Sequence, residues 1–420
     1  MKIVIVTYNW PPRNAIGTHR PYSWAKAWAK NGAQVMVITA QKQAFDEPLD
    51  LELPAIPGVQ VVEVPYMRGA GHAASLLGAG RIKAAAKKYW TILRKLSGRT
   101  LQARDRWAVD AEEFARLASS DADIVVSTYG PAAAHVIASK MKAANPAIKW
   151  VADYRDPWSN NREFSLAQQS SERALERNTI ESADFVTTVS PSLVVELERF
   201  LGKRVELVPN GFDLDEDAVI EALSRDTRRP VNSPMRIVYT GMLYAGTRDP
   251  QPLLTALAEL SDAGHIKHGD ITVDFYGARV ELAAKLASNG RYGPFVRIFG
   301  HVTRDVALRA QRSADLLLLL EGSGEESRGV LTGKIFEYIC SGRPILCIGS
   351  RPDFDIGLVI KECGVGTLVY ENYDKTLPAL ILATMRGEGV CSAYQPIVKE
   401  VLKYSRQRSA KRMFHLMTTS

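Results

Sequence analysis

Short, continuous runs of apolar residues recur along the 420-residue chain and alternate with stretches of helical periodicity. Runs rich in valine, isoleucine and leucine are typical of parallel strands buried on both faces of a sheet. Their alternation with helix-length segments predicts a doubly wound α/β fold. The runs that we expect to be strands cover residues 33–39, 59–65, 122–128, 148–154, 183–190, 205–211, 271–277, 296–300, 314–320, 344–349 and 366–370.

Two segments with nearly the same pattern divide the chain. MKIVIVTYNWPP (1–12) and MRIVYTGMLYAG (235–246) each predict a β-branched strand that ends in a turn. Each would open one Rossmann-like domain, and the polar, charged segment before the second predicts a linker. The predicted organisation is an N-terminal domain (1–208), a linker (209–234), a C-terminal domain (235–395) and a C-terminal helix that crosses back to the first domain (396–420).

The composition is that of an ordinary globular protein with large cores, since 46% of the residues are hydrophobic. No apolar run reaches the roughly 20 residues of a membrane-spanning helix, and the first apolar run is too short for a signal peptide. We therefore expect a cytoplasmic protein. The cysteines form no CxxC pair, which indicates reduced, buried thiols at Cys340, Cys347, Cys363 and Cys391.

The net charge of +7 is concentrated between residues 81 and 106, where nine lysines and arginines accompany a single acidic residue, Asp105. Apolar residues at helical spacing run through this stretch, so it predicts a helix with one apolar and one basic face. Two interpretations stay open: a solvated surface helix, or a helix that holds the protein at an anionic membrane surface. We expect no nucleic-acid partner, because no zinc-finger spacing or RNA-binding aromatic signature is present.

The segment RGVLTGKIFEYICSGRPILCIG (328–349) predicts a turn, a short helix and a buried strand. Gly329 and Gly333 bracket the turn, and a helix beginning near Lys334 would direct free backbone amides toward the carboxyl edge of the sheet, where ligands bind. The spacing excludes a Walker A loop, and Ile335 replaces its Ser/Thr. No GxGxxG follows either opening strand, which argues against a nicotinamide dehydrogenase.

A lysine and a glutamate enter the first turns of that helix. Glu337 could accept hydrogen bonds from two neighbouring hydroxyls, as on a ribose, and Lys334 could neutralise a diphosphate. The alternative is that both are ordinary solvated surface residues.

The order of several motifs resembles the retaining nucleotide-sugar glycosyltransferases of the GT-B fold, the glycosyltransferase 4 family. The resemblance runs from Met1 to about Ser405 and implies two Rossmann-like doubly wound domains facing a central cleft. It rests on PPRNAIGTHR, VADYRDPW, ADFVTTVS, VPNGFD, YTGMLYAGTRDP, VDFYG, ADLLLLL and GVLTGKIFEYICSGRPIL in this order.

The resemblance implies a donor site in the second half of the chain. Glu337 would bind the ribose, while Arg248, which follows Gly241, and Lys334 would neutralise the diphosphate. The base would contact the loops at Gly277, His301 and Val302, and the diphosphate would contact the backbone of Val330, Leu331, Thr332 and Gly333.

On the acceptor side, the resemblance implies that the loop from Gly17 to Arg20 and the DYRDPW turn line the cleft where the acceptor binds. The candidate side chains are Asp153, Arg155, Asp156 and His135, while Trp158 is either a stacking platform for a sugar or a buried aromatic. One departure is plain: Gly329 stands eight positions before Glu337, where the family commonly has a second glutamate, so the contact to the transferred sugar is not assigned.

The chemistry expected of such a site is electrostatic. Arg248 and Lys334 would stabilise the departing diphosphate, and Asp153 and Asp156 would orient the acceptor hydroxyl or act as its base. The mechanism implied by the resemblance needs no metal and no cofactor beyond the nucleotide sugar. DLD (213–215) and DFD (353–355) are better interpreted as caps than as metal-binding motifs.

The function that these observations favour is transfer of a sugar from a nucleoside diphosphate sugar to a glycan or lipid-linked acceptor, in cell-surface polysaccharide or glycoconjugate synthesis. The enzyme would work in the cytoplasm, at the inner face of the membrane if the basic helix binds there. Two alternatives stay open, a nucleotide-sugar 2-epimerase on the same fold and a non-catalytic nucleotide-sugar-binding or membrane-associated module.

Overall fold

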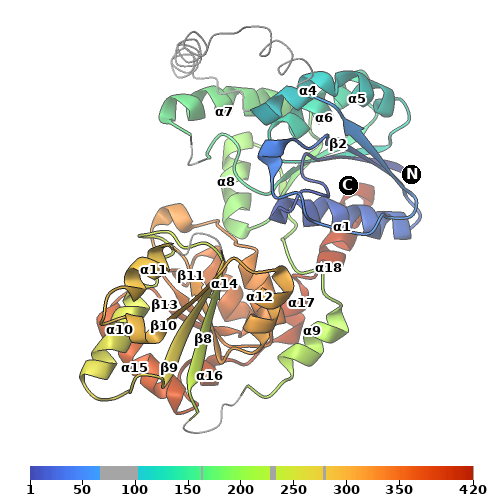
Figure 1. Cartoon of the computed structure of the whole chain (residues 1–420). Coiled ribbons are helices and arrows are strands. Elements are labelled where there is room, and N and C mark those ends of the chain that lie inside the picture. Colours follow the sequence, from blue (N-terminus) through green and yellow to red (C-terminus); the bar gives the residue numbers. More distant parts are fainter. Residues whose placement is uncertain (67–102, 162–163, 228–232, 278–280, 420) are drawn as a thin grey trace. The chain divides into compact units, whose positions relative to one another are not determined.

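The computed structural model describes residues 1–66, 103–161, 164–227, 233–277 and 281–419. It divides the chain into two compact units, residues 1–209 with 409–420 and residues 210–408. Each is a parallel sheet with helices on both faces (Figure 1). All the predicted strands are present. The run at 205–211 is strand only over Val205–Leu207, because Pro209 has no N–H to pair.

The first unit contains a seven-stranded sheet in the order β3-β2-β1-β4-β5-β6-β7. All the neighbouring strands are parallel, and β1 lies between β2 and β4 in direct register. The strands are β1 (Lys2–Val6), β2 (Gln34–Ala40), β3 (Val59–Val64), β4 (Ile124–Thr128), β5 (Lys149–Tyr154), β6 (Phe185–Thr188) and β7 (Val205–Leu207).

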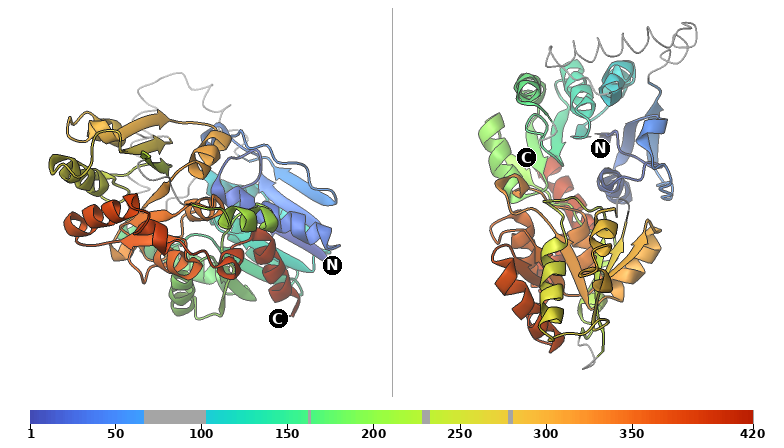
Figure 2. Two further views of the ribbon diagram at one scale, coloured as in Figure 1. Left: turned by 90° about the horizontal axis from the view of Figure 1, so that it is seen from below. Right: turned by 60° about the vertical axis from the view of Figure 1, so that its left-hand side comes forward.

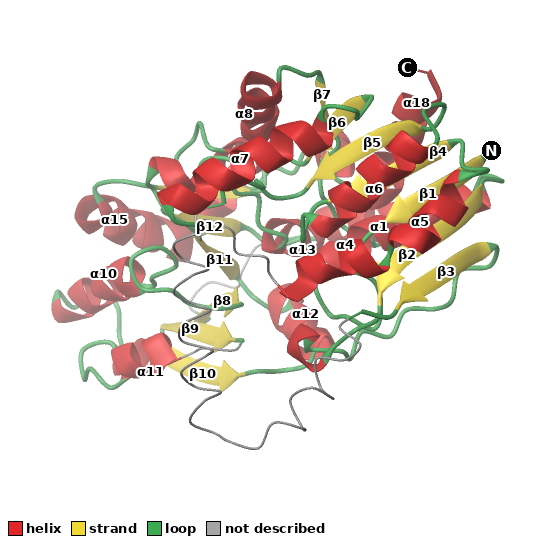
Figure 3. Cartoon of the chain, turned by 90° about the horizontal axis from the view of Figure 1, so that it is seen from above, coloured by secondary structure: helices red, strands yellow, loops and turns green. Residues whose placement is uncertain are grey.

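Helices cover both faces of this sheet because successive residues of each strand point to opposite sides (Figure 3). Val4 and Val6 of β1 join one core, and Ile3 and Ile5 join the other. Helices on the first side are α4 (Trp107–Asp110), α5 (Glu112–Ser119), α6 (Ala133–Ala144), α7 (Leu166–Ile180) and α8 (Pro191–Leu201); on the second side they are α1 (Ile16–Lys30) and α18 (Arg406–Thr419).

The second unit contains a six-stranded parallel sheet in the order β10-β9-β8-β11-β12-β13. Its core is double-sided in the same way: Leu316, Leu318 and Leu320 of β11 face one side, and Leu317 and Leu319 face the other. The strands are β8 (Met235–Thr240), β9 (Ile271–Tyr276), β10 (Val296–Gly300), β11 (Leu316–Leu320), β12 (Ile345–Ile348) and β13 (Gly366–Val369).

Two helix layers enclose this second sheet (Figure 2). Helices of the first layer are α10 (Gln251–Asp262), α11 (Glu281–Ala287), α15 (Tyr373–Met385) and α16 (Val390–Ala393); those of the second are α9 (Glu216–Leu223), α12 (Arg304–Arg312), α13 (Lys334–Cys340), α14 (Asp355–Cys363) and α17 (Val398–Leu402). Short 3₁₀ helices are η1 (Ala44–Asp46), η2 (Ala103–Arg106), η3 (Gly293–Phe295) and η4 (Glu325–Ser327).

Part of the segment predicted as a linker (209–234) is helical. Its α9 packs Val219 and Leu223 into the core of the second unit, because these apolar residues fall on one face of the helix. Most of the predicted basic helix (81–106) lies outside the described residues, and Ala103–Arg106 form η2. Of the helices that the structure describes, none is both long and apolar enough to cross a membrane.

Candidate functional site

The second sheet reverses its strand order between β8 and β11, and the segments that follow these two strands bring Arg248 and Glu321 together. The Arg248 Nη2 lies 3.7 Å from the Glu321 Oε2, an ion pair longer than a hydrogen bond. In open α/β sheets ligands bind at such a switch point, beyond the carboxyl ends of the strands. The residue pair therefore marks the place in this unit where a ligand is expected.

Lys334 reaches the same place from the first residue of α13. Its Nζ donates a hydrogen bond of 2.9 Å to the Tyr239 hydroxyl and lies 4.5 Å from the centre of the Tyr239 ring. Burial, aided by the nearby charge of Arg248, lowers the pKa of Lys334 to about 8, although Glu321 and Glu337 oppose the shift. Lys334 is thus a cation confined beside another cation, and it is poised to receive an anion.

Glycine at position 241 makes room for this lysine. Gly241 has φ +131°, and a Cβ there would overlap the Lys334 side chain. Gly277, with φ +140°, has a similar role, since a Cβ would overlap the carbonyl oxygen of Gly241. The turns after β8 and β9 therefore pack against each other and against Lys334 only because both positions are glycine.

Glu321 is a buried carboxylate, 7% exposed, directly after β11. Burial raises its pKa, and the charges of Arg248 and Lys334 oppose the rise. Its Oε1 has no hydrogen-bond partner among the described residues. The carboxylate also lines a cavity of about 470 Å³ beside Thr247, Asp249 and Ser323. Glu321 was not among the site residues predicted from the sequence, although an acidic residue directly after a buried strand is a signal for a site.

The turn before α13 contains backbone amides that are free for a ligand. The amides of Leu331, Thr332 and Gly333 make no hydrogen bond within the described part of the chain, whereas the Val330 amide donates to the Ser327 carbonyl oxygen at 3.2 Å. The predicted turn therefore offers three donors rather than four. Helix α13 has only seven residues, so Lys334 and Arg248 contribute more positive charge here than the helix dipole does.

Glu337 is half-buried, one turn into α13, and its Oε1 accepts a hydrogen bond of 3.3 Å from Arg304. Sequence reasoning did not find Arg304, because nothing in the spacing from α12 to α13 indicates this contact. His301 is exposed, while Val302 packs partly into the core. Of the predicted donor residues, the structure brings Gly241, Gly277, Arg248 and Lys334 together and adds Glu321.

Two of the predicted acceptor residues are buried partners of each other. The Asp153 carboxylate is fully buried and accepts hydrogen bonds from Arg20 Nε and Nη2, Thr128 and Thr187, at 2.7–3.1 Å. Arg20 is itself 2% exposed and also donates to the carbonyl oxygens of Val208 and Pro209. Asp153, predicted to orient the acceptor or to act as a base, and Arg20, predicted to contact the acceptor, are in the structure hydrogen-bonded core groups that join α1 to β4, β5 and β6.

His135, a predicted acceptor contact, and Trp158, predicted as either a stacking platform or a buried aromatic, are both buried in the structure. His135 is fully buried, and its Nδ1 lies 2.7 Å from the Ser127 Oγ. Burial lowers the pKa of His135 to about 3, so it is neutral at physiological pH. Trp158 is 1% exposed and donates its Nε1–H to Glu172 at 2.7 Å. The sequence could not reveal this burial, because His135 faces inward from α6 at a position that a helix pattern leaves ambiguous.

The remaining candidates of the first unit are Gly17, which is buried, Arg155, which is partly buried, and Asp156, which is exposed. The Arg155 Nε donates to Asp156 Oδ2 at 3.1 Å, and the Asp156 side chain is 62% exposed. A Cβ on Gly17 would overlap the Arg155 guanidinium. Glycine here lets the Arg155 head rest against the start of α1, close to the Asn9 side chain.

The first unit matches a known protein family. Residues 17–211 match the family model described as a glycosyl transferase 4-like domain. Among curated proteins, no sequence matches the chain significantly.

Solved structures with the same fold cover nearly the whole chain. Sucrose-phosphate synthase from Thermosynechococcus elongatus matches with a TM-score of 0.62 at 14% identity, covering 99% of this chain and 98% of its own. The α,α-trehalose-phosphate synthase (UDP-forming) from Burkholderia xenovorans, in complex with glucose-6-phosphate, matches with 0.61 at 13%, covering 99% and 100%. An E. coli structure described as trehalose-6-phosphate bound with UDP-2-fluoro glucose gives 0.62 at 12%, covering 100% and 99%.

These matches confirm the GT-B fold, with two parallel α/β units. Residues 17–211, just under half of the chain, match a glycosyl transferase 4-like domain, and with the shared fold this supports a nucleotide-sugar-dependent glycosyltransferase.

Proposed function

We propose that the enzyme moves a sugar from a nucleoside diphosphate sugar to a glycan or lipid-linked acceptor, with retention of configuration and without a metal, in cell-surface polysaccharide or glycoconjugate synthesis. The observation that carries the donor half of this proposal is the convergence of Arg248 and Lys334 at the switch point of the second sheet. A single buried carboxylate, Glu321, accompanies them, so the site retains positive charge for a diphosphate.

The roles of the donor residues follow from their chemistry. Cleavage of the sugar–phosphate bond places negative charge on the departing diphosphate, which Arg248, Lys334 and the amides of Leu331 to Gly333 would stabilise. Glu337 is exposed enough to accept hydrogen bonds from the two ribose hydroxyls if Arg304 releases it. Glu321 has a free oxygen that fits a sugar hydroxyl, which would supply the contact that Gly329 cannot make.

Few of the predicted residues could take the proton of the acceptor hydroxyl. Asp153 has no lone pair left for a substrate proton, so Asp156 is the exposed carboxylate that remains from the predicted pair. In the retaining mechanism the leaving phosphate itself takes the proton of the acceptor hydroxyl, and no protein nucleophile is required.

The test begins with the donor. Thermal unfolding of the purified protein is measured with UDP, GDP, ADP and TDP, in the wild type and in the Glu337→Ala variant, with Glu362→Ala as the matched control on an exposed face of α14. We expect one nucleotide to stabilise the wild type, by about 2.7 kcal/mol at a hundredfold excess over Kd. The effect should disappear in E337A and persist in E362A.

A second assay then separates the enzyme classes with the sugar form of that nucleotide. Sugar transfer that needs an acceptor supports the proposal. Release of an epimerised sugar without an acceptor would identify a 2-epimerase, and binding without any product would identify a non-catalytic module. Stabilisation by none of the nucleotides would contradict the donor site itself.

A further inference from the structure

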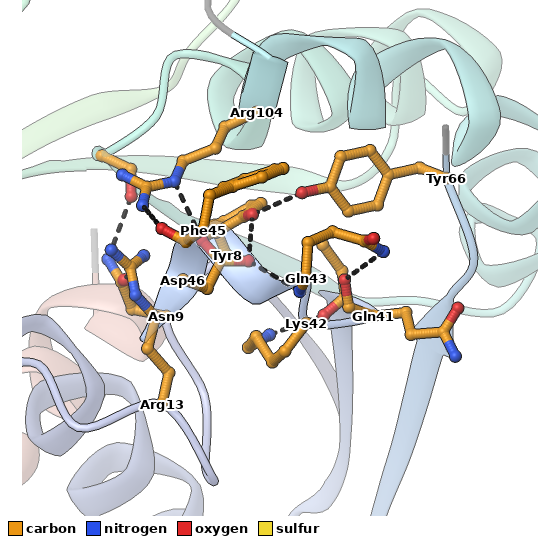
Figure 4. A network of polar contacts seen from close by, with 12 residues as sticks. Tyr8, Asn9, Arg13, Gln41, Lys42, Gln43, Phe45, Asp46, Tyr66 and Arg104 are labelled. Carbon is orange, nitrogen blue, oxygen red and sulfur yellow. Dashed lines mark hydrogen bonds and ion pairs between the residues drawn. The ribbon is translucent and has the colours of Figure 1, made fainter. Parts of the chain in front are cut away.

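Three cations that the transferase site does not use gather in the first unit around the ring of Tyr8 (Figure 4). The Arg13 Cζ, the Lys42 Nζ and the Arg104 Cζ lie 5.5, 5.3 and 5.6 Å from the centre of that ring. They come from the loop after β1, the loop after β2 and η2. Segments far apart in the sequence therefore converge at the carboxyl edge of the sheet, where ligands bind in this kind of fold.

Among the described residues, the carboxylate bonded to this cluster is Asp46, and it is already saturated. Asp46 is fully buried and accepts hydrogen bonds from the Tyr8 hydroxyl at 2.7 Å, the Gln43 amide at 3.0 Å and the Arg104 Nε at 3.0 Å. Its charge offsets that of Arg104. Its charge also favours the protonated forms of Arg13 and Lys42, but one negative charge does not balance three positive ones.

Arg13 and Lys42 have only neutral partners. Arg13 donates to the side-chain oxygen of Asn9 at 2.5 Å, and Lys42 donates to the Thr39 hydroxyl at 3.1 Å and to the Ala40 carbonyl oxygen. No ion pair joins either of them to a carboxylate within the described ranges of the chain. Two partly buried positive charges therefore lie near the same Tyr8 ring, and neither forms an ion pair with a carboxylate of the described residues.

This arrangement is unfavourable without a ligand. The pKa of Arg13 is lowered by burial and then by the charge of Arg104, and the pKa of Lys42 is lowered to about 8 by burial, with Arg13 adding to the shift. Glu63 and Asp46 oppose the shift of Lys42 without cancelling it. An anion between the cations would relieve their mutual repulsion.

The cations are mounted on a rigid base. The Tyr8 hydroxyl is hydrogen-bonded to Asp46 and lies 2.5 Å from the Tyr66 hydroxyl, and the rings of Tyr66 and Trp107 pack edgewise against Tyr8 at 6.2 and 5.8 Å. All three aromatic residues are buried, whereas the Arg104 side chain keeps 30% of its surface exposed. The aromatic base beneath the positive groups is thus fixed before a ligand arrives, and the Arg104 side chain is partly open to solvent.

We propose that Arg13, Lys42 and Arg104 bind the phosphoryl group of the acceptor, so that the acceptor is a phosphorylated sugar. A phosphate dianion matches two uncompensated cations, and arginine forks suit phosphate geometry. The proposal rests on the transferase function proposed above, and it assigns the acceptor phosphate to the first unit. The phosphoryl group has two sources, a soluble sugar phosphate or the phosphate that joins a sugar to a lipid.

The test compares the wild type with the double variant Arg13→Gln/Lys42→Met. The matched control is Lys30→Met/Arg116→Gln, which removes two exposed cations of the same unit. Binding of glucose 6-phosphate, glucose and inorganic phosphate is measured by calorimetry, and binding to phosphatidylcholine vesicles with and without polyprenyl phosphate is measured by sedimentation. UDP binding is measured in every variant.

We expect the wild type to bind glucose 6-phosphate or the polyprenyl phosphate vesicles, but not glucose. The double variant should bind about tenfold more weakly for each charge-assisted hydrogen bond that it loses. The control should bind as the wild type does. Arg13→Lys in place of Arg13→Gln should restore part of the affinity that the double variant loses. The probe that binds identifies the source of the phosphoryl group.

Equal binding of these probes by wild type and double variant, or no binding of any of them, overturns the acceptor proposal while UDP binding leaves the donor site intact. Failure of the wild type to bind UDP or any other nucleotide overturns the transferase function, and with it the role of this cluster in acceptor binding. An unchanged midpoint of tryptophan fluorescence on urea unfolding shows that the double variant is folded.

Discussion

Burial decides the roles of the residues that a motif places together. Asp153 lies near the end of β5 and Asp156 in the turn that follows, three positions later, and the sequence motif does not distinguish their roles. In the structure Asp153 is enclosed by four donated hydrogen bonds, whereas Asp156 has a side chain that is 62% exposed. The sequence could predict the turn itself but not this difference, because the partners of Asp153 come from Arg20, Thr128 and Thr187.

The Asp153→Asn variant should therefore fail through instability rather than through chemistry. It removes the charge opposite a buried arginine, which typically destabilises a protein by about 3–5 kcal/mol. Asp156→Asn breaks a surface pair worth about 0–1 kcal/mol. Urea unfolding followed by tryptophan fluorescence measures both. An Asp153→Asn protein with wild-type stability and no transfer activity would restore Asp153 to the catalytic site.

Lys334 should give donor binding a pH dependence. Its pKa of about 8 means that the ammonium is charged below this pH and neutral above it. The diphosphate is fully ionised above about pH 7, so the affinity for the nucleotide should be constant up to about pH 8 and then fall as the pH rises. Calorimetric titration of the nucleotide at pH values on both sides of pH 8 measures this change of slope, which we call the bend in the pH profile of affinity.

The variants that test this pH dependence are Lys334→Met and Lys361→Met. Lys334→Met should bind the nucleotide more weakly and lose the bend, because the titrating group is gone. Lys361→Met, an exposed lysine of α14, should keep both the affinity and the bend. A bend that survives in Lys334→Met would assign the titration to another group.

At the scale of elements, the strands were predictable because each is a continuous apolar run between polar turns. Helix α9 was not, since its three acidic residues and the charged residues on either side of it resemble a charged linker until the core of the second unit is known. The donor turn was predictable from Gly329, Gly333 and Lys334. The packing of the β8 and β9 turns against Lys334 depends on backbone conformation, which the letters of the sequence do not specify.

Gly241→Ala should disturb this element more than an ordinary glycine substitution does. Its positive φ alone costs about 1–2 kcal/mol in a non-glycine residue, and the new Cβ would also displace Lys334. Gly269, with φ +95° and open space around it, is the matched control, because an alanine there has only the energetic cost of its backbone conformation and no steric overlap. We expect Gly241→Ala to weaken nucleotide binding about tenfold, the effect of losing one charge-assisted hydrogen bond, and Gly269→Ala to leave binding unchanged. Equal binding by the two variants would contradict the role of Gly241.

At the scale of the whole molecule, the two units contain different reporter side chains. All seven tryptophans lie in the first 209 residues, and all four cysteines lie between residues 340 and 391. Cys340, Cys347 and Cys363 are buried. Tryptophan fluorescence therefore reports the first unit, and labelling of the buried thiols reports opening of the second, so one protein sample shows which unit a ligand stabilises.

The nucleotide and the sugar phosphate should act on different signals. A nucleoside diphosphate held by Arg248 and Lys334 should slow thiol labelling, because binding to the folded state lowers the open population by mass action. Glucose 6-phosphate held by Arg13, Lys42 and Arg104 should instead raise the urea midpoint of tryptophan fluorescence. The Lys334→Met and Arg13→Gln/Lys42→Met variants should each lose one effect and keep the other. A nucleotide that shifts both signals equally would show that residues of the first unit share in holding the donor, and would contradict the assignment of each ligand to one unit.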